Sequence, residues 1–285
     1  MKNHAKTFPI EMMAKILQVS RSSYYLPQEA SKRSLENQEI VKKIKEVYKE
    51  SRETYGSPRI HKVLNKKGIK CSKPRVARLM KKSQICAKMT KAWKRTTKQK
   101  QGAIVAPNHL DQNFKVDVPN KAWVSDITYV PTEEGWLYVS ISLDLFSRKI
   151  VGLSMGDSLE TSLVLKTLDQ AFIHRKPELG LLHHSDRGCQ YTSSAFKTLM
   201  EKHQILLSMS GTGCCYDNAV AESFFHTLKT EHTNFYKYRT REEAMNSIFE
   251  YVEVFYNRER LHSTLGYISP VDYESLWEVK MFTHS

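Results

Sequence analysis

The spacing of hydrophobic residues changes once along the chain, and the change separates two kinds of structure. Before residue 88, apolar side chains recur every three or four positions, as Ile40, Ile44 and Val47 do. After residue 121, short apolar runs rich in β-branched and aromatic residues replace that spacing. The pattern predicts an all-α N-terminal region followed by an α/β C-terminal region.

The N-terminal region is expected to contain a short pair of helices and then a group of three. Residues 9–25 predict one short helix, a turn, and a second helix that begins at the N-cap Ser20. In the group of three, the YGSP motif at residues 55–58 ends the first helix, Gly68 ends the second, and Pro74 begins the third. The three helices are predicted over residues 36–53, 59–68 and 74–82.

The C-terminal region predicts a mixed sheet with helices around it. Three β-rich runs come first, and the turns at Glu134-Gly135 and Arg148-Lys149 connect them as an antiparallel meander. Two more strands alternate with helices, so the fourth strand would lie parallel to the first after a crossover helix. The strands are predicted at residues 121–132, 135–147, 149–158, 179–186 and 205–210, and the helices at 158–175, 193–204, 219–231 and 241–260.

The net charge of +14 is unevenly distributed. Residues 1–100 contain 27 Lys and Arg against 7 Asp and Glu, whereas residues 101–285 contain 17 against 23. No acidic residue occurs from Thr54 to Leu110. Basic side chains gain free energy by releasing the counterions condensed on phosphates, so the N-terminal region predicts a nucleic-acid partner. A solvated, lysine-rich surface is the alternative.

Candidate DNA contacts lie in this basic region. The predicted helix 74–82 is typical of one that docks in the major groove or on phosphates, although a helical bundle with a basic face would show the same pattern. Residues 88–115 lack periodicity and are interpreted as a basic linker that follows the phosphate backbone. The candidate contacts are Arg59, Arg75, Arg78, Lys81 and Lys82 in the helices, and Lys94 and Arg95 in the linker.

Cysteine use and hydropathy favour a cytoplasmic protein. None of the five cysteines forms a CxxC pair, so a zinc ribbon is not expected, and their odd number favours free thiols in a reducing compartment. The N-terminus lacks the apolar stretch of a signal peptide. No run approaches the roughly 18 apolar residues that a membrane-spanning helix needs, so no membrane partner is expected.

Three acidic residues carry the candidate chemistry. Asp126 and Asp186 are placed at the ends of strand-like runs, in WVSDITYV and LLHHSD, and Glu222 lies within the predicted helix 219–231. A parallel neighbour of the first strand would place Asp186 beside Asp126, and the longer Glu222 side chain could reach the same position. Carboxylates this close repel one another and so favour cations. Two Mg²⁺ ions held by such oxygens can serve both ends of a phosphodiester displacement.

Basic residues near the acids are further candidates. Lys229 and His226 follow Glu222 by seven and four residues, on the same face of a helix, where a cation would hold a DNA strand against the metal ions. One of the adjacent His183 and His184 must point inward from its strand, so at least one is expected to be structural.

Two other acids are rivals of these three. Asp144 is predicted in mid-strand, where a buried carboxylate needs a partner, so it is either a fourth site residue or part of a structural network. Asp157 is typical of a turn.

Several sequence blocks resemble one family. WVSDITYV, HSDRGCQYTS, DNAVAESFFHTLKTE and YNRERLHSTLGYISPVDYE, with YGSPRI in the basic region, are similar to blocks of bacterial insertion-sequence transposases of the OrfB type, whose core resembles retroviral integrase. As in that family, 35 residues lie between Asp186 and Glu222, and a lysine follows the glutamate by seven positions. The resemblance covers nearly the whole chain.

The resemblance implies a ribonuclease-H-like fold in which Asp126, Asp186 and Glu222 are the catalytic, metal-binding triad of the DDE class. The implied activity is cleavage at element ends that depends on two Mg²⁺ ions, for which Mn²⁺ would substitute, followed by attack of the exposed 3′-hydroxyl on another phosphodiester. The implied partners are double-stranded DNA, further copies of the chain, and an upstream-frame protein or a frameshift fusion with it. Arg187 stands where Gln is more frequent, and GTGCC at residues 211–215 replaces a more basic stretch.

Two alternatives to a transposase are a DNA-binding regulator with an inactive or partner-dependent core, and a general ribonuclease-H-like nuclease. All three acids are present, which disfavours the first, and the basic helices favour duplex recognition over the second. A glycosidase, which also uses paired carboxylates, has no use for so basic a region.

We expect the chain to have four parts. They are a helix-turn-helix-like segment at 1–30, a basic helix-turn-helix DNA-binding domain at 31–87, a basic linker at 88–115, and an integrase-like core with a C-terminal helical extension at 116–285.

Overall fold

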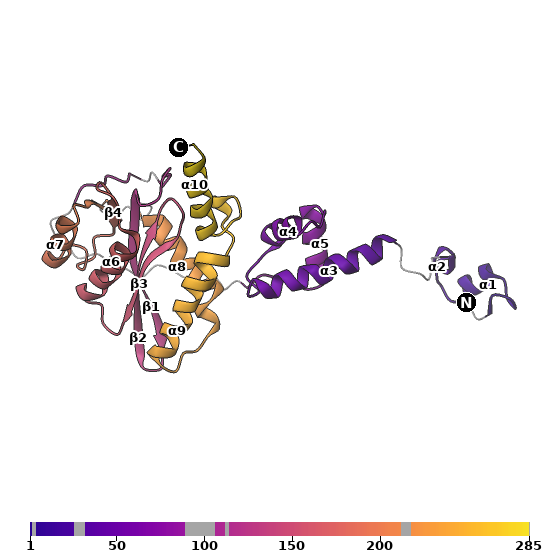
Figure 1. Cartoon of the computed structure of the whole chain (residues 1–285). Coiled ribbons are helices and arrows are strands. Elements are labelled where there is room, and N and C mark those ends of the chain that lie inside the picture. Colours follow the sequence, from indigo (N-terminus) through magenta and orange to yellow (C-terminus); the bar gives the residue numbers. More distant parts are fainter. Residues whose placement is uncertain (2–3, 26–31, 89–105, 112–113, 212–217, 285) are drawn as a thin grey trace. The chain divides into compact units, whose positions relative to one another are not determined.

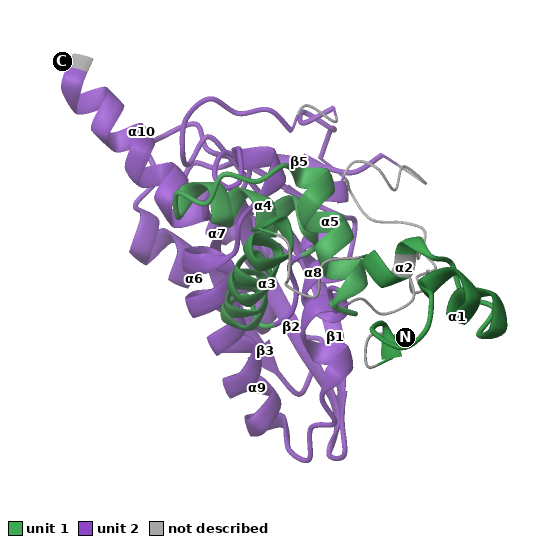
Figure 2. Ribbon diagram, turned by 90° about the vertical axis from the view of Figure 1, so that its right-hand side faces the viewer, with its two compact units in different colours: residues 1–52, 56–86 green, residues 53–55, 87–285 purple. Residues whose placement is uncertain are grey.

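The computed structural model describes residues 1, 4–25, 32–88, 106–111, 114–211 and 218–284. The chain divides into two compact units, shown in green and purple in Figure 2. The smaller unit comprises residues 1–52 and 56–86, and the larger unit comprises residues 53–55 and 87–285.

In the smaller unit, every described element is a helix. α1 (Ile10–Ile16) and α2 (Ser22–Tyr25) are short, whereas α3 (Lys32–Glu50), α4 (Ser57–Lys66) and α5 (Lys73–Lys82) are longer and pack against one another. The predicted group of three helices is therefore confirmed. Its core contains four completely buried side chains, Ile44, Ile60, Leu64 and Val76.

Several helix starts in this unit differ from the prediction. α4 begins at Ser57, so Pro58 lies in its first turn, where the missing N–H of proline costs no hydrogen bond. α2 begins at Ser22, so Ser20 does not directly precede it as an N-cap would, and its hydroxyl instead hydrogen-bonds the hydroxyl of Ser22. In α5, Ser72 is the N-cap, because its hydroxyl accepts the backbone N–H of Arg75.

The larger unit is built on a five-stranded sheet of order β3-β2-β1-β4-β5. Figure 1 shows strands of this sheet with helices around them. β1 (Ala122–Thr132), β2 (Gly135–Asp144) and β3 (Ile150–Gly156) form the predicted antiparallel meander. β4 (Leu182–Ser185) is parallel to β1, and β5 (Leu206–Met209) is parallel to β4. The predicted mixed α/β core is confirmed, with β1 at its centre.

Helices pack on this sheet and bury its apolar side chains. α6 (Thr161–Arg175) packs on β2 and β3, and α8 (Ala219–Glu231) contacts β1. α6 and α7 (Ser194–Lys202) help to enclose Trp123, whose indole stacks on Phe172 with 5.7 Å between ring centroids. This core holds β1 and β4 in the register that positions the candidate acids.

One close contact between sheet and helix requires glycine. A Cβ atom on Gly152 of β3 would lie 2.3 Å from the backbone oxygen of Thr167 in α6. Any other residue would push the helix away from the strand, because real Cβ atoms do not approach an oxygen so closely.

The C-terminal part extends beyond the prediction. α9 (Arg241–Glu250) continues into a π-helical segment, η4 (Tyr251–Glu259), so the predicted long helix has nearly its predicted extent but widens in its last turns. The sequence patterns did not predict α10 (Pro270–His284), which contacts η4. No helix in the described ranges is long and apolar enough to cross a membrane. Two short 3₁₀ turns complete the region, η3 (Thr233–Phe235) and η5 (Ser263–Leu265).

Candidate active site and DNA-contact residues

The sheet register brings two of the three candidate acids to neighbouring positions. Parallel pairing aligns Val124 of β1 with His184 of β4. Asp126 follows Val124 by two residues, and Asp186 follows His184 by two residues. The two acids are therefore neighbours at the point where β4 has just ended. The placement of Asp126 at the end of a strand-like run is wrong, because β1 continues to Thr132 along its antiparallel partner β2, but the predicted strand bounds of 121–132 are confirmed.

Local hydrogen bonds orient these two carboxylates. An oxygen of Asp126 accepts the backbone N–H of Ile127 at 2.8 Å, and an oxygen of Asp186 accepts that of Gly188 at 2.9 Å. Both side chains are half-buried. Burial and then the charges of Asp186 and Glu222 raise the pKa of Asp126 to about 8. Burial also raises the pKa of Asp186. A cation would relieve this repulsion, which suits a carboxylate site for hard metal ions.

Glu222 approaches from the first turn of α8, with its side chain exposed. The side-chain amide of Asn218 donates to the backbone oxygen of Ser125 at 3.2 Å and so holds the start of this helix beside β1. Among the described residues, no three His, Cys, Asp or Glu side chains are close enough to share a metal ion. The charges of Asp186 and Glu222 act on Asp126, but the three acids do not form a closed set of ligands.

Lys229 lies near the other end of α8 and is half-buried. Its Nζ atom lies 5.2 Å from the ring centroid of Tyr129 on β1. Burial lowers the pKa of Lys229, and the charge of Asp126 opposes that shift. The seven-residue spacing thus brings a cation to the strand that carries Asp126. His226 is exposed on the same helix, and its DNA contact stays a prediction.

Both adjacent histidines are buried and hydrogen-bonded to serines. His183 Nε2 lies 2.8 Å from the hydroxyl of Ser125, and burial lowers the pKa of this histidine to about 3. His184 lies 2.8 Å from the hydroxyl of Ser208 and 3.2 Å from that of Ser210. These contacts connect β1, β4 and β5, which supports a structural role for both.

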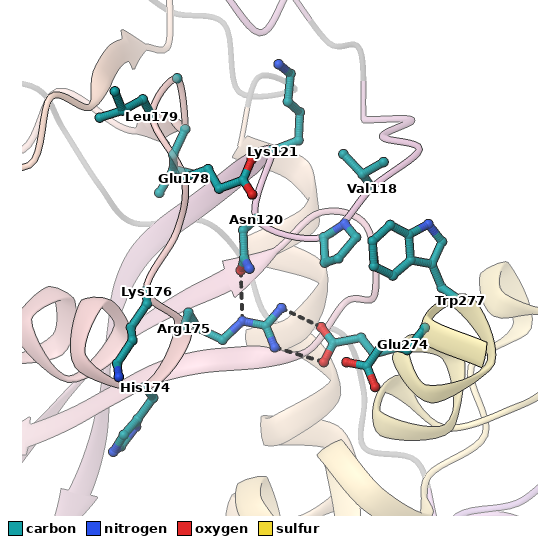
Figure 3. A pocket seen from close by; sticks show the side chains of 14 residues that line it. Val118, Asn120, Lys121, His174, Arg175, Lys176, Glu178, Leu179, Glu274 and Trp277 are labelled. Atoms are coloured by element: carbon teal, nitrogen blue, oxygen red, sulfur yellow. Dashed lines mark hydrogen bonds and ion pairs between the residues drawn. The ribbon is translucent and has the colours of Figure 1, made fainter. Parts of the chain in front are cut away.

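Asp144 belongs to a structural network at the beginning of β1. Its carboxylate accepts the backbone N–H groups of Asn120 and Phe146, and pairs with Arg175 at 3.2 Å. Arg175 also donates twice to the carboxylate of Glu274 in α10, at 2.8 Å each, as Figure 3 shows from within the neighbouring pocket. The charged groups of this network satisfy one another, which favours the structural interpretation of Asp144. The other rival, Asp157, is exposed after β3.

The candidate DNA contacts of the smaller unit differ in their freedom to reach a ligand. Arg75 is half-buried and donates to Asn37 at 3.0 Å and to Glu36 at 3.3 Å, so it connects α5 to α3. Arg59 is half-buried as well. The linker candidates Lys94 and Arg95 lie outside the described residues. Three candidates on α5 are exposed, namely Arg78, Lys81 and Lys82.

Two exposed aromatic residues near Lys229 were not among the candidate site residues that the sequence predicted. Tyr129 is 37% exposed and Trp136 is 48% exposed, and they meet across the β1–β2 hairpin. In the sequence they look like ordinary members of strand-like runs. Only the termination of β4 and the packing of α8 show that they remain on the surface.

Family models match most of the chain. An HTH-like domain matches residues 35–93, and integrase core domains match residues 117–215 and 222–276. An HTH-like domain joined to an integrase core defines a DNA-recombining enzyme of the DDE transposase and integrase class.

Curated relatives specify the family. The chain is 41% identical to the "Insertion element IS600 uncharacterized 31 kDa protein" of Shigella sonnei, over 90% of this chain and 96% of that protein. It is 42% identical to the transposase for insertion sequence element IS904 of Lactococcus lactis subsp. lactis, over 86% and 96%. It is 34% identical to transposase InsF for insertion sequence IS3A of Escherichia coli K12, over 96% of each. The chain belongs to the insertion-sequence transposases with an integrase core.

Proposed function

We propose that the chain binds the terminal repeats of its insertion sequence, cleaves DNA there and joins the freed end to a target. The β1–β4 register carries the assignment of the catalytic residues, because it brings Asp126 beside Asp186. The charge of Glu222 on Asp126 supports adding this third acid. In the first step, water attacks the phosphorus and the bond to O3′ breaks, which leaves a 3′-hydroxyl. In the second, that hydroxyl attacks another phosphodiester and displaces its 3′ oxygen.

The donor set fits divalent cations. It consists of carboxylate oxygens, which Mg²⁺ prefers, and burial, together with the charges of Asp186 and Glu222, raises the pKa of Asp126 to about 8. We assign two Mg²⁺ ions, replaceable by Mn²⁺, to Asp126, Asp186 and Glu222. Bound there, such ions activate the attacking oxygen and stabilise the leaving oxygen. Glu222, exposed on α8, can change rotamer to complete the set.

The remaining residues position DNA in this account. Lys229 places a positive charge next to Asp126, where it would attract the phosphates on either side of the scissile bond. His226 is exposed one helical turn before it. In the smaller unit, the exposed cations of α5 would contact the duplex, while Arg75 holds that helix against α3. We assign duplex binding to residues 31–87, with residues 1–30 and the linker 88–115 assisting, and chemistry to residues 116–285.

The reaction also suggests partners. Joining two element ends to a target requires two active sites, so we propose that copies of the chain assemble on DNA in the cytoplasm. An upstream-frame protein, or a fusion with it by frameshifting, would complete the active form.

The catalytic assignment is tested by separating binding from cleavage. Asp186→Asn should abolish strand cleavage of a labelled terminal-repeat duplex, while its affinity for that duplex stays within about twofold, because the smaller unit is unchanged. Asp157→Asn is the matched control, since this acid is exposed after β3 and should leave cleavage intact. Retained cleavage by Asp186→Asn would refute the site. Binding without cleavage by the unaltered chain would instead favour a DNA-binding regulator.

A further inference from the structure

The β1–β2 hairpin presents two large aromatic side chains to solvent. Tyr129 and Trp136 pack edge to face, with 4.9 Å between ring centroids and 77° between ring planes. They are diagonal neighbours on one face of the sheet, because Tyr129 pairs with Tyr138 while Trp136 pairs with Pro131. They remain 37% and 48% exposed. Large rings exposed side by side are typical of binding surfaces rather than of an inert hairpin.

Two cations flank this Tyr129–Trp136 pair. The Nζ atom of Lys229 lies 5.2 Å from the Tyr129 ring centroid. Next to Trp136, Nε of Arg241 donates to the backbone oxygen of that residue at 3.1 Å. Glu134 is also near, since it accepts the backbone N–H of Arg241 at 2.8 Å, and this bond fixes the position of the arginine. The surface thus combines ring faces with positive charge.

Lys229 also connects the pair to the candidate acids. Its charge acts on Asp126, three residues before Tyr129 on β1. Asp126 and Tyr129 are therefore about 10 Å apart along the strand, and the side chains of these two residues point to opposite faces of the sheet. Because β4 ends at Ser185, no strand covers that side of β1 at residues 127–131 within the described parts of the chain. A DNA strand leaving the acids can pass over this edge beside Lys229 and reach the rings.

We propose that the Tyr129–Trp136 pair is a stacking site for an unpaired base of the DNA strand held at the acids, with Lys229 and Arg241 contacting its phosphates. Every base has a π face, so aromatic rings next to cations bind single strands with little sequence preference. A stacked base would keep the strand end separated from its complement while the adjacent phosphodiester reacts. The inference rests on the proposed function, because that function supplies the strand.

The test compares two probes that differ only in unpaired bases. A blunt duplex, and the same duplex with a single-stranded 3′ tail, are titrated with the full chain carrying Asp186→Asn, in the absence of divalent ions. The tail should increase affinity by about tenfold, the scale of stacking one base on an aromatic side chain. Trp136→Ala should abolish this preference without changing blunt-duplex affinity, and Trp136→Phe should retain most of it.

Controls separate a stacking site from a general loss of fold or charge. Phe282→Ala removes another exposed aromatic ring of the same unit, 84% exposed on α10, and should keep the tail preference. Absence of tail preference in the parent, or a preference unchanged by Trp136→Ala, would overturn the inference. Because the assay needs no cleavage, its result is independent of the Asp186 cleavage test. A tail preference lost with Trp136 supports the stacking site even if cleavage fails.

Discussion

The replacement Asp126→Asn should make the metal-free protein more stable at alkaline pH. The pKa of Asp126 is raised from 3.8 to about 8, so the folded state holds this proton more tightly than the unfolded state. The unfolded chain binds fewer protons above pH 4, and stability falls as pH rises from about 4 to about 8. Asparagine keeps the shape of the aspartate side chain and has no proton to lose, so the stability of the variant does not fall in this pH range for this reason.

The magnitude follows from the shift. One pKa unit corresponds to about 1.4 kcal/mol. The rise of the Asp126 pKa from 3.8 to about 8 therefore sets an upper bound of about 6 kcal/mol on the gain in unfolding free energy from Asp126→Asn. The side chain is half-buried, and water screens part of the repulsion, so we expect about 2–3 kcal/mol at pH 8 and almost none at pH 4. Added Mn²⁺ should stabilise the unaltered chain more than the variant, since the ion compensates the same charges.

Urea unfolding followed by tryptophan fluorescence measures this free energy. All four tryptophans lie between residues 93 and 277, so fluorescence reports on the larger unit. Titrations at pH 4, 6 and 8 in a chelator compare the unaltered chain, Asp126→Asn and the exposed control Asp169→Asn on α6. A variant that is no more stable at pH 8, or equally more stable at pH 4, would refute the electrostatic account.

Three further predictions concern packing, ion pairs and DNA binding. Gly152→Ala should lower the free energy of unfolding by about 1–3 kcal/mol, because its Cβ would overlap a backbone oxygen of α6, whereas Gly156→Ala meets only an ordinary 3.5 Å contact and should not; urea unfolding compares them. Glu231→Gln should lower the free energy of unfolding by about 3 kcal/mol in the same assay, because it leaves the buried Arg260 without the carboxylate that it contacts at 2.6 Å. A decrease below about 1 kcal/mol would contradict this. Arg78→Ala should weaken duplex binding and reduce its salt dependence, while Arg75→Ala should mainly lower the melting temperature of the smaller unit; the reverse result in fluorescence anisotropy and calorimetry would contradict their assignment.

The sequence predicted the elements well where local patterns decide them. Apolar alternation marked the strands of the sheet, and Pro74 marked the start of α5. The predicted strand 121–132 matches β1, although Asp126 was placed at the end of a strand-like run and lies in the interior of the strand. The π-helical turns of η4 and the helix α10 depend on tertiary packing that no local pattern records.

The candidate site shows the same division. The spacing of acids after strand-like runs placed Asp126 beside Asp186, since parallel pairing determines it. The role of Asp144 stayed open in the sequence, because its partner Arg175 is 31 residues away along the chain. Arg75 looked like a DNA contact, because a pattern of basic residues does not reveal which of them an acid from another helix holds.

The most direct test of the catalytic account is nicking and joining of a labelled duplex that carries the ends of the insertion sequence, with Mg²⁺ or Mn²⁺. Glu222→Gln should abolish both reactions while DNA binding persists, because it removes one carboxylate of the proposed triad. The control Glu178→Gln alters an exposed acid that lines the pocket shown in Figure 3 and should react normally. Metal-dependent cutting and joining by the unaltered chain, lost only in Glu222→Gln, is the predicted result. Unimpaired cutting by Glu222→Gln would contradict the account.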